Sequence, residues 1–208
     1  MPRKTAAGSL YSPHPGIEYA RSVLAHFERT TGKSIEAWVE LLQTAGPADA
    51  KARRAWLKAE HGVGTNMAWW IAERAEGRGL EDTDPELYLK AAPGYVEAMY
   101  ASGKAGLRPL HDRLVELGRS LGPDVKVCPC QTIVPLYRNH VFAQIKPATR
   151  TRIDFGLALG NTKTTGRLLD TGGFAKKDRI THRIPITKPA DIDAEVKKWL
   201  KVAYDRDA

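Results

Sequence analysis

The chain has 208 residues, of which 42% are hydrophobic and 27% are charged, and its formal net charge at pH 7 is +8. These values are those of a soluble globular protein and exclude a fibrous or largely disordered chain. The positive charge is concentrated, because residues 121–188 hold twelve Lys or Arg against four Asp or Glu, while the other segments together sum to zero. A region with such a surplus is a candidate for contact with a polyanion.

Nothing in the sequence suggests export or membrane insertion. The first sixteen residues contain no apolar stretch long enough for a secretory signal, and no segment approaches the roughly 20 apolar residues of a membrane span. The two cysteines, Cys128 and Cys130, are too few and too close in sequence for a disulfide framework. We therefore expect a cytoplasmic protein in a reducing compartment, without a membrane partner.

The first part of the chain is predicted to be helical. Residues 1–16, rich in Pro, Ser, Gly, Lys and Arg, are expected to form a flexible tail, and residues 17–80 a helical domain. Apolar periodicity and helix signals predict four short helices in that domain. They begin after residue 16, after Ser34, at Asp49 and at Thr65, and they end at Gly32, Gly46-Pro47, Glu60 and Gly77. Ser34 and Thr65 are expected as N-caps, because their hydroxyls can accept a backbone N–H.

Residues 85–208 are expected to form an α+β domain. Two brief helices and a longer amphipathic helix come first, and beyond Gly122-Pro123 the apolar period changes to two, which indicates strands. The helices are predicted at 86–91, 95–102 and 107–121, the strands at 125–128, 132–137, 140–146, 152–159 and 179–186, and a last helix at 192–204. The predicted fold class is α+β: a small helical bundle with a helix-hairpin-helix-like turn, then an antiparallel sheet of about five strands covered on one face by two helices.

The segment 147–159 combines the alternation of a strand with clustered arginines. Its odd-numbered positions from Ile153 onward are apolar, and Arg152 and Asp154 fall on the opposite face. With the neighbouring strands and the loop of residues 160–178, this predicts a basic face suited to phosphate oxygens. The candidate nucleic-acid or anion-binding residues are Lys146, Arg150, Arg152, Lys163, Arg167, Lys176, Lys177, Arg179 and Arg183. The alternative is a solvated face whose lysines and arginines protect the edges of the sheet.

A second candidate contact lies in the helical domain, where Gly62-Val63-Gly64 is followed by Ala68 and Ile71. This spacing matches the turn of a helix-hairpin-helix motif, whose glycines let the backbone approach a phosphate. The residues of this possible phosphate contact are Gly62, Gly64 and Thr65. The lysine that such hairpins often carry is absent, and a plain turn with a glycine stop and a threonine cap explains the same residues.

The cysteines and histidines give little support for a metal site. If Arg138-Asn139 forms a two-residue hairpin, Tyr137 pairs with His140. Cys130 then lies roughly 23 Å from His140, at about 3.3 Å per strand residue, so the two cannot share a metal. A single Cys-x-Cys, here Cys128 and Cys130, is a weak zinc signal.

Other polar residues have structural explanations. His182 has the parity of the apolar face and is expected as a hydrogen-bonded core histidine. Asp154 is expected to pair with Arg150 or Arg152. We therefore name no catalytic residue, no metal site and no cofactor, and we favour a non-enzymatic role.

Several stretches resemble known families. Residues 31–42, Trp56-Leu57-Lys58 and residues 61–64 resemble the domain of unknown function numbered 4287. Residues 107–114, residues 147–157 and Thr181-His182-Arg183 resemble the domain of unknown function numbered 5655. The resemblance covers nearly all of the chain after the N-terminal tail. It implies a bacterial protein built from two parts, and it carries over no catalytic residue.

Three functions are compatible with these patterns. The leading hypothesis is a non-enzymatic module that binds nucleic acid or another polyanion through phosphate contacts on the basic sheet and loop face, with the helical hairpin as a second contact. The runner-up is a small anionic-ligand-binding protein or enzyme whose pocket, between sheet and helices, is lined by Arg150, Arg152, Arg167 and Arg183. The third is an adaptor that docks a protein partner through an exposed Trp69 or Trp70; the simpler expectation is that both are buried.

Overall fold

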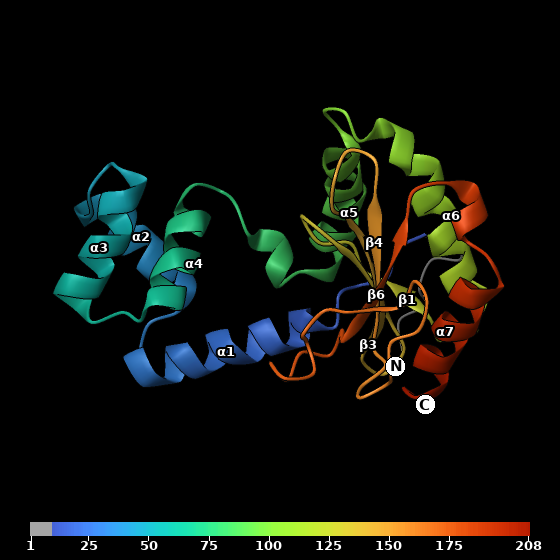
Figure 1. Ribbon diagram of the computed structural model, residues 1–208. Coiled ribbons are helices and arrows are strands. Elements are labelled where there is room, and N and C mark those ends of the chain that lie inside the picture. The colour runs from blue at the N-terminus through green and yellow to red at the C-terminus, as the bar shows by residue number, and fades with distance from the viewer. Residues whose placement is uncertain (1–9) are drawn as a thin grey trace. The chain divides into compact units, whose positions relative to one another are not determined.

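The computed structural model describes residues 10–208 (Figure 1). Contacts divide these residues into two compact units. The helical unit comprises residues 13–88, and the sheet unit comprises residues 89–208 together with residues 10–12. Within residues 10–208, no helix is both long enough and apolar enough to cross a membrane.

The segment before the first helix differs from the expected flexible tail. Residues 1–9 lie outside the described residues. Beyond them, the backbone N–H of Ser12 donates a hydrogen bond to the carbonyl of Val127 at 2.9 Å, and the ring of His14 lies edge-on to that of Tyr88, 6.0 Å between centroids. Residues 12 and 14 are therefore held by folded parts of the chain.

The helical unit is built from short helices whose ends follow from the sequence. They are α1 (Gly16–Thr31), α2 (Ile35–Ala45), α3 (Ala50–His61) and α4 (Thr65–Ala75), followed by a short 3-10 helix, η1 (Leu80–Asp82). Gly32 ends α1 in the left-handed conformation, at φ 69°. The Ser34 hydroxyl accepts the N–H of Ala37 at 3.2 Å, and this cap starts α2 as predicted.

The core of the helical unit lies among α2, α3 and α4. Its buried members are Ile35, Trp38, Leu42, Leu57, Val63, Ala68, Ile71 and Ala72. Leu24 and Phe27 of α1 pack against the same cluster. Since α4 contributes Ala68, Ile71 and Ala72 to this core, one face of α4 is fixed inward and the opposite face is free to form a surface.

The sheet unit contains the remaining elements. They are most of α5 (Pro85–Tyr100), η2 (Ala105–Leu107), α6 (Arg108–Arg119), β1 (Lys126–Val127), β2 (Val134–Tyr137), β3 (Val141–Pro147), β4 (Ile153–Leu157), β5 (Leu169–Asp170), β6 (His182–Ile186), η3 (Pro189–Asp191) and α7 (Ala194–Asp205). The six strands form one antiparallel sheet in the order β1-β2-β3-β4-β6-β5. The α+β prediction is confirmed, with β5 as a short additional strand inside the expected loop.

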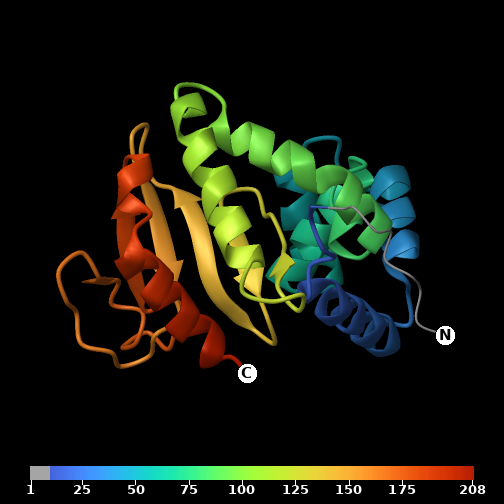
Figure 2. The same ribbon diagram turned by 90° about the vertical axis from the view of Figure 1, so that its right-hand side faces the viewer.

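Two helices cover one face of the sheet, as predicted. Figure 2 shows α6 and α7 side by side in front of it. A Cβ atom at Gly118 of α6 would lie 2.5 Å from Leu136 Cδ1 of β2, so α6 packs closely on that strand. The ring of Tyr204, on α7, lies edge-on to that of Phe142 on β3, 5.6 Å between centroids. The opposite face of the sheet is called the outer face here.

The prediction of two brief helices at 86–91 and 95–102 is wrong, because α5 is continuous across Pro93. Proline lacks a backbone N–H, and inside a helix it normally costs about 3 kcal/mol relative to alanine. Ala92, Val96 and Met99 nevertheless lie on one buried helical face. Packing of that face outweighs the local preference for a break.

The predicted register of the β2–β3 hairpin is also wrong. Tyr137 pairs with Val141 rather than with His140, and the register shifts between Leu136 and Tyr137. The side chain of Asp207, near the C-terminus, accepts the N–H of His140 at 2.7 Å. This long-range hydrogen bond favours a three-residue turn over the two-residue hairpin that local sequence suggests.

Candidate nucleic-acid interface

Two of the candidate arginines on the sheet unit share one carboxylate. Asp154, on β4, accepts hydrogen bonds from Arg152 Nε and from Arg183 Nη1, each at 2.8 Å. The expected pairing of Asp154 with a neighbouring arginine is therefore confirmed for Arg152. Because both guanidinium groups already have an anionic partner, an incoming phosphate would have to compete with Asp154 for them.

Arg167 is held by acidic residues at the start of α7. Its Nη2 lies 2.6 Å from Asp193 Oδ2, its Nε lies 3.3 Å from Glu195 Oε2, and its Nη1 donates to the carbonyl of Asp191 at 3.1 Å. Arg179 donates to the buried carboxylate of Asp207 in the same way. Four of the nine cations predicted to face a ligand are thus bonded within the protein.

The outer face of the sheet has a groove of about 600 Å³ with charges of both signs. Its charged lining residues are Lys146, Asp154, Asp170, Asp178, Arg179 and Arg183. Three carboxylates balance three cations there, so this groove is not an anion-binding surface by charge alone.

The remaining five cations have no ion-pair partner among residues 10–208, but they are spread over several elements. Lys146 lies on β3 and Arg150 in the β3–β4 turn, where its side chain approaches Gly103. Lys163, Lys176 and Lys177 lie in the long connection between β4 and β6. All five are exposed.

The arginine-lined pocket of the runner-up hypothesis is not formed by its four proposed residues. Arg152 and Arg183 meet at Asp154, whereas Arg167 lies at the start of α7 and Arg150 beside Gly103. Only two of the four guanidinium groups share a neighbour, and the four do not line one cavity.

The hairpin of the helical unit differs from a plain capped turn. Gly62 ends α3 at φ 64°, and its N–H donates to the carbonyls of Leu57 and Lys58, as a glycine stop should. The N-cap of α4, however, is Gly64, which has no side chain to cap the helix. Thr65, predicted as the cap, is instead the first residue of α4. The glycine stop of the plain-turn explanation is therefore confirmed, and its threonine cap is wrong.

The first turn of α4 therefore presents unused backbone donors. In the part of the chain that the structure describes, the N–H groups of Thr65, Asn66 and Met67 have no hydrogen-bond partner; the first one used is that of Ala68, which donates to Gly64. A Cβ atom added at Gly64 would meet nothing within 4 Å. The backbone here is open to a ligand, and the partial positive charge of a helix N-terminus favours an anion.

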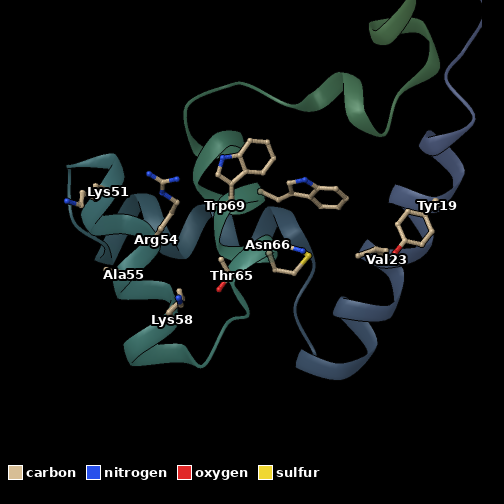
Figure 3. A pocket seen from close by; sticks show the side chains of 11 residues that line it. Tyr19, Val23, Lys51, Arg54, Ala55, Lys58, Thr65, Asn66 and Trp69 are labelled. Atoms are coloured by element: carbon tan, nitrogen blue, oxygen red, sulfur yellow. The ribbon is translucent and has the colours of Figure 1, made fainter. Parts of the chain in front are cut away.

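A groove of about 710 Å³ lies beside this hairpin (Figure 3). Three exposed cations of α3, namely Lys51, Arg54 and Lys58, line one side. Their spacing of three and four residues puts them in one row along the helix. None of the three forms an ion pair within residues 10–208. The full lining is Tyr19, Val23, Lys51, Arg54, Ala55, Lys58, Thr65, Asn66, Met67, Trp69 and Trp70.

Aromatic rings line the other side of the groove. Trp69 of α4 is 42% exposed and Tyr19 of α1 is 74% exposed, whereas Trp70 is half-buried against the core. The expectation that both tryptophans are buried is therefore wrong for Trp69. The groove lining contains no Asp or Glu. We call this surface, with its eleven lining residues, the aromatic–basic groove.

Sequence reasoning missed this groove although part of its signal was present. Lys51, Arg54 and Lys58 can be placed on one helix face from the sequence alone. A count of charge over whole segments conceals such a row, because acidic residues elsewhere in the helical unit offset it.

The histidine and cysteine side chains named above have structural explanations. His182 is buried; its Nε2 donates to the carbonyl of Thr162 at 2.8 Å, and its Nδ1 accepts from the Thr181 hydroxyl at 2.9 Å, which confirms it as a core histidine. Burial raises the pKa of the Cys128 thiol to about 12, so this group is not a thiolate at neutral pH. Over residues 10–208, no three His, Cys, Asp or Glu side chains lie together as a metal site requires.

Comparison with known families supports the two-part division. A family model described as Domain of unknown function (DUF4287) matches residues 20–77, and one described as Domain of unknown function (DUF5655) matches residues 96–207. A search of curated proteins and a search of solved structures give no match. The resemblance seen in the sequence is confirmed on both parts. Because the match to residues 96–207 covers more than half of the 208 residues, the chain belongs to the family described as Domain of unknown function (DUF5655).

Proposed function

We propose that the protein is a non-enzymatic module that binds nucleic acid, with the aromatic–basic groove of the helical unit as its main contact surface. One observation carries this proposal: the groove lining combines three unpaired cations with exposed aromatic rings and no carboxylate. A surface of that composition attracts a polyanion without first having to break a close ion pair, although Arg54 also has a longer-range attraction to Glu73.

The row of cations on α3 supports contact with successive phosphates. From Lys51 to Lys58 the helix rises about 10 Å, at 1.5 Å per residue. Three cations spread over this length can each contact one phosphate of a strand that runs along α3. The side chain of Arg54, in the middle of the row, also offers a planar fork that can contact a phosphate through two N–H groups.

The hairpin supplies a second kind of phosphate contact next to this row. Thr65 and Asn66 line the groove, and their backbone N–H groups have no hydrogen-bond partner among residues 10–208. Amides at a helix N-terminus bind phosphate oxygens without any charged side chain, which removes the need for the hairpin lysine that this sequence lacks.

The basic face of the sheet unit is a secondary contact in this proposal. Its unpaired members, such as Lys176 and Lys177, can still contribute long-range attraction. Its arginines are less suitable as primary contacts, because Asp154, Asp207 and the acidic residues at the start of α7 already engage them. The cytoplasmic location expected from the sequence, where nucleic acid is available, is part of the same proposal.

Fluorescence anisotropy with labelled oligonucleotides tests the proposal in the full chain. The groove variant combines Lys51→Gln, Arg54→Gln and Lys58→Gln, and the loop variant combines Lys163→Gln, Lys176→Gln and Lys177→Gln. A variant with the same loss of charge elsewhere, Lys90→Gln with Lys126→Gln and Lys197→Gln, is the matched control. Binding is measured at several salt concentrations between about 50 mM and about 200 mM.

The wild-type affinity is expected to fall steeply with salt and to depend weakly on base sequence. Each lost phosphate contact lowers the slope of log affinity against log salt by about 0.7 for a single strand, so the groove variant is expected to lose about 2 from this slope. The loop and control variants should change it less. Absence of binding, or affinity that ignores salt, contradicts the proposal, and a loss confined to the loop variant moves the site to the sheet unit.

A protein-docking function is the second candidate, because Trp69 is exposed beside cations. A groove with an aromatic side and a basic side also suits an acidic, partly apolar peptide. Tight binding of a peptide of alternating Glu and Leu, without binding of any oligonucleotide, would favour this candidate.

A further inference from the structure

We infer that the aromatic–basic groove takes single-stranded nucleic acid, with an unpaired base stacked on the indole of Trp69. This inference rests on the proposed function and names the form of nucleic acid that the site accepts. It is carried by the position of exposed rings opposite the row of cations.

Trp69 differs from Trp38 and Trp56 in having no ring partner among residues 10–208, and from Trp70 in not packing against the core of the helical unit. The ring of Trp38 packs against those of Phe27 and His61, and the ring of Trp56 also packs against His61. Trp69 makes no ring contact within residues 10–208, and 42% of its surface is exposed. Tyr19, which is 74% exposed, lines the same groove, and exposed aromatic rings gathered in one groove mark a candidate ligand surface.

The helix geometry places Trp69 on the ligand side of α4. Ala68, Ile71 and Ala72 face the core, whereas Thr65 and Trp69, four residues apart, lie on the neighbouring face that lines the groove. The free amides of the hairpin and the indole are therefore on the same side of one helix. A phosphate at the hairpin and a base at Trp69 can belong to the same short piece of strand.

The opposite side of the groove completes the arrangement. Figure 3 shows Lys51, Arg54 and Lys58 on α3 to one side of Trp69, and Tyr19 on α1 to the other. A strand whose backbone follows α3 can turn its bases toward α4 and α1. The groove volume of about 710 Å³ lies in the range of about 300–1,000 Å³ typical of sites for small organic groups, which accommodates an unpaired base.

A duplex fits this arrangement poorly. Paired bases are stacked on one another and offer only their edges in the grooves, so the face of an indole cannot reach them. Single strands expose base faces, and stacking on aromatic side chains holds them with little dependence on sequence. Thr65 and Asn66 add uncharged polar side chains to the lining, which can contact a base edge and suit a weak base preference.

The test compares a fluorescein-labelled oligothymidine of about 15 nucleotides with a duplex of the same length, using Trp69→Ala, Trp69→Phe and a matched control, Phe174→Ala. Phe174 is an exposed aromatic residue of the sheet unit, 56% exposed, and lies outside the groove. Far-UV circular dichroism and urea denaturation check that each variant is folded.

The wild-type protein is expected to prefer the single strand. Trp69→Ala should weaken single-strand binding about tenfold, within the range that stacking of one base contributes, and should change duplex binding less than about twofold. Trp69→Phe, which keeps a ring, should retain most of the affinity, and Phe174→Ala all of it.

Four outcomes overturn the inference, and they separate it from the proposed function. Equal affinity for both probes, or Trp69→Ala without effect on a salt-dependent affinity, leaves nucleic-acid binding in place and removes the stacking role. No binding of either probe removes both. Trp69→Ala that weakens binding of an alternating Glu–Leu peptide but not of the single strand shows that the ring docks a protein segment.

Discussion

His111 is a buried histidine whose charge is controlled by its surroundings. It is almost fully buried on α6, and its Nδ1 lies 3.0 Å from the hydroxyl of Tyr100. Burial lowers the pKa of His111 to about 4. The charges of neighbouring residues contribute less: Asp112 raises this pKa and Arg108 lowers it. Burial likewise raises the pKa of the Tyr100 hydroxyl. Both groups are therefore neutral in the folded protein at neutral pH.

This histidine predicts how stability depends on pH. The unfolded chain binds a proton at His111 below pH of about 6.5, whereas the folded chain does so only below about 4, so protonation favours unfolding in that window. The contribution to stability is complete above pH of about 6.5 and is lost as pH falls toward 4. The contribution of His111 to the free energy of unfolding falls by about 2 kcal/mol between pH 7 and pH 4.5.

Urea denaturation at the two pH values measures this loss. The free energy of unfolding of His111→Gln should fall between pH 7 and pH 4.5 by about 2 kcal/mol less than that of the wild type. The control is His26→Gln, since His26 is exposed on α1, and it should behave as the wild type. Equal pH dependence in wild type and His111→Gln contradicts the assignment.

The hairpin before α4 links local structure to the proposed activity. A helix N-cap is usually Ser, Thr, Asp or Asn, and Gly64 leaves the amides of Thr65 to Met67 available instead. Its backbone is extended, at φ −62° and ψ 153°, and has open space for a Cβ atom. A side chain is therefore tolerated at this position without strain.

Gly64→Asp should separate stability from binding. The new carboxylate can cap α4, which stabilises a helix by a few tenths of a kcal/mol relative to glycine. It also occupies the free amides and adds negative charge beside the groove, so oligonucleotide affinity should fall about fivefold or more. Gly64→Ser, a neutral cap, should weaken binding less. Urea denaturation and anisotropy measure the two effects, and unchanged affinity in Gly64→Asp contradicts a phosphate contact at the hairpin.

The continuity of α5 across Pro93 can be tested by a substitution next to the proline. Gly94 follows Pro93 inside the helix and is exposed, and a Cβ atom at this position would meet no other heavy atom within 4 Å. Gly94→Ala should therefore raise the free energy of unfolding by about 0.5–1 kcal/mol, the usual gain in a helix interior. A loss of stability in urea denaturation would instead indicate a turn at Pro93-Gly94.

The sequence predicted elements best where the signal is local. Gly32, Ser34 and Gly62 mark helix ends in the structure as they do in the sequence, because caps act within a few residues. It failed where distant residues decide. Packing carries α5 across Pro93, and the hydrogen bond from His140 to Asp207 sets the β2–β3 turn.

The charge of the whole molecule shows the same limit for the candidate site. Residues 121–188 have a surplus of +8, but the carboxylates that engage Arg167 and Arg179 come from Asp193, Glu195 and Asp207, beyond that segment. A charge count over one segment includes these arginines but not the carboxylates that neutralise them, because the partners are distant in sequence and adjacent only in the fold. Conversely, Lys51, Arg54 and Lys58 make one surface of the helical unit basic, although the charge of the whole unit does not indicate it.

The two matched families correspond to units that differ in surface chemistry. The helical unit carries the aromatic–basic groove, whereas the outer face of the sheet unit carries paired charges of both signs. The proposed division is that the helical unit supplies the main contact with nucleic acid and the sheet unit a weaker electrostatic contribution.

Hydrogen–deuterium exchange of the full chain, with and without a saturating oligothymidine, shows which backbone amides the nucleic acid protects. The amides of Thr65, Asn66 and Met67 make no hydrogen bond within the described residues and should exchange rapidly in the free protein. We expect the oligonucleotide to slow exchange at these amides and along residues 51–58, with little change in β3, β4 and β6. Slowed exchange confined to those strands and the loop of residues 158–181 would contradict it.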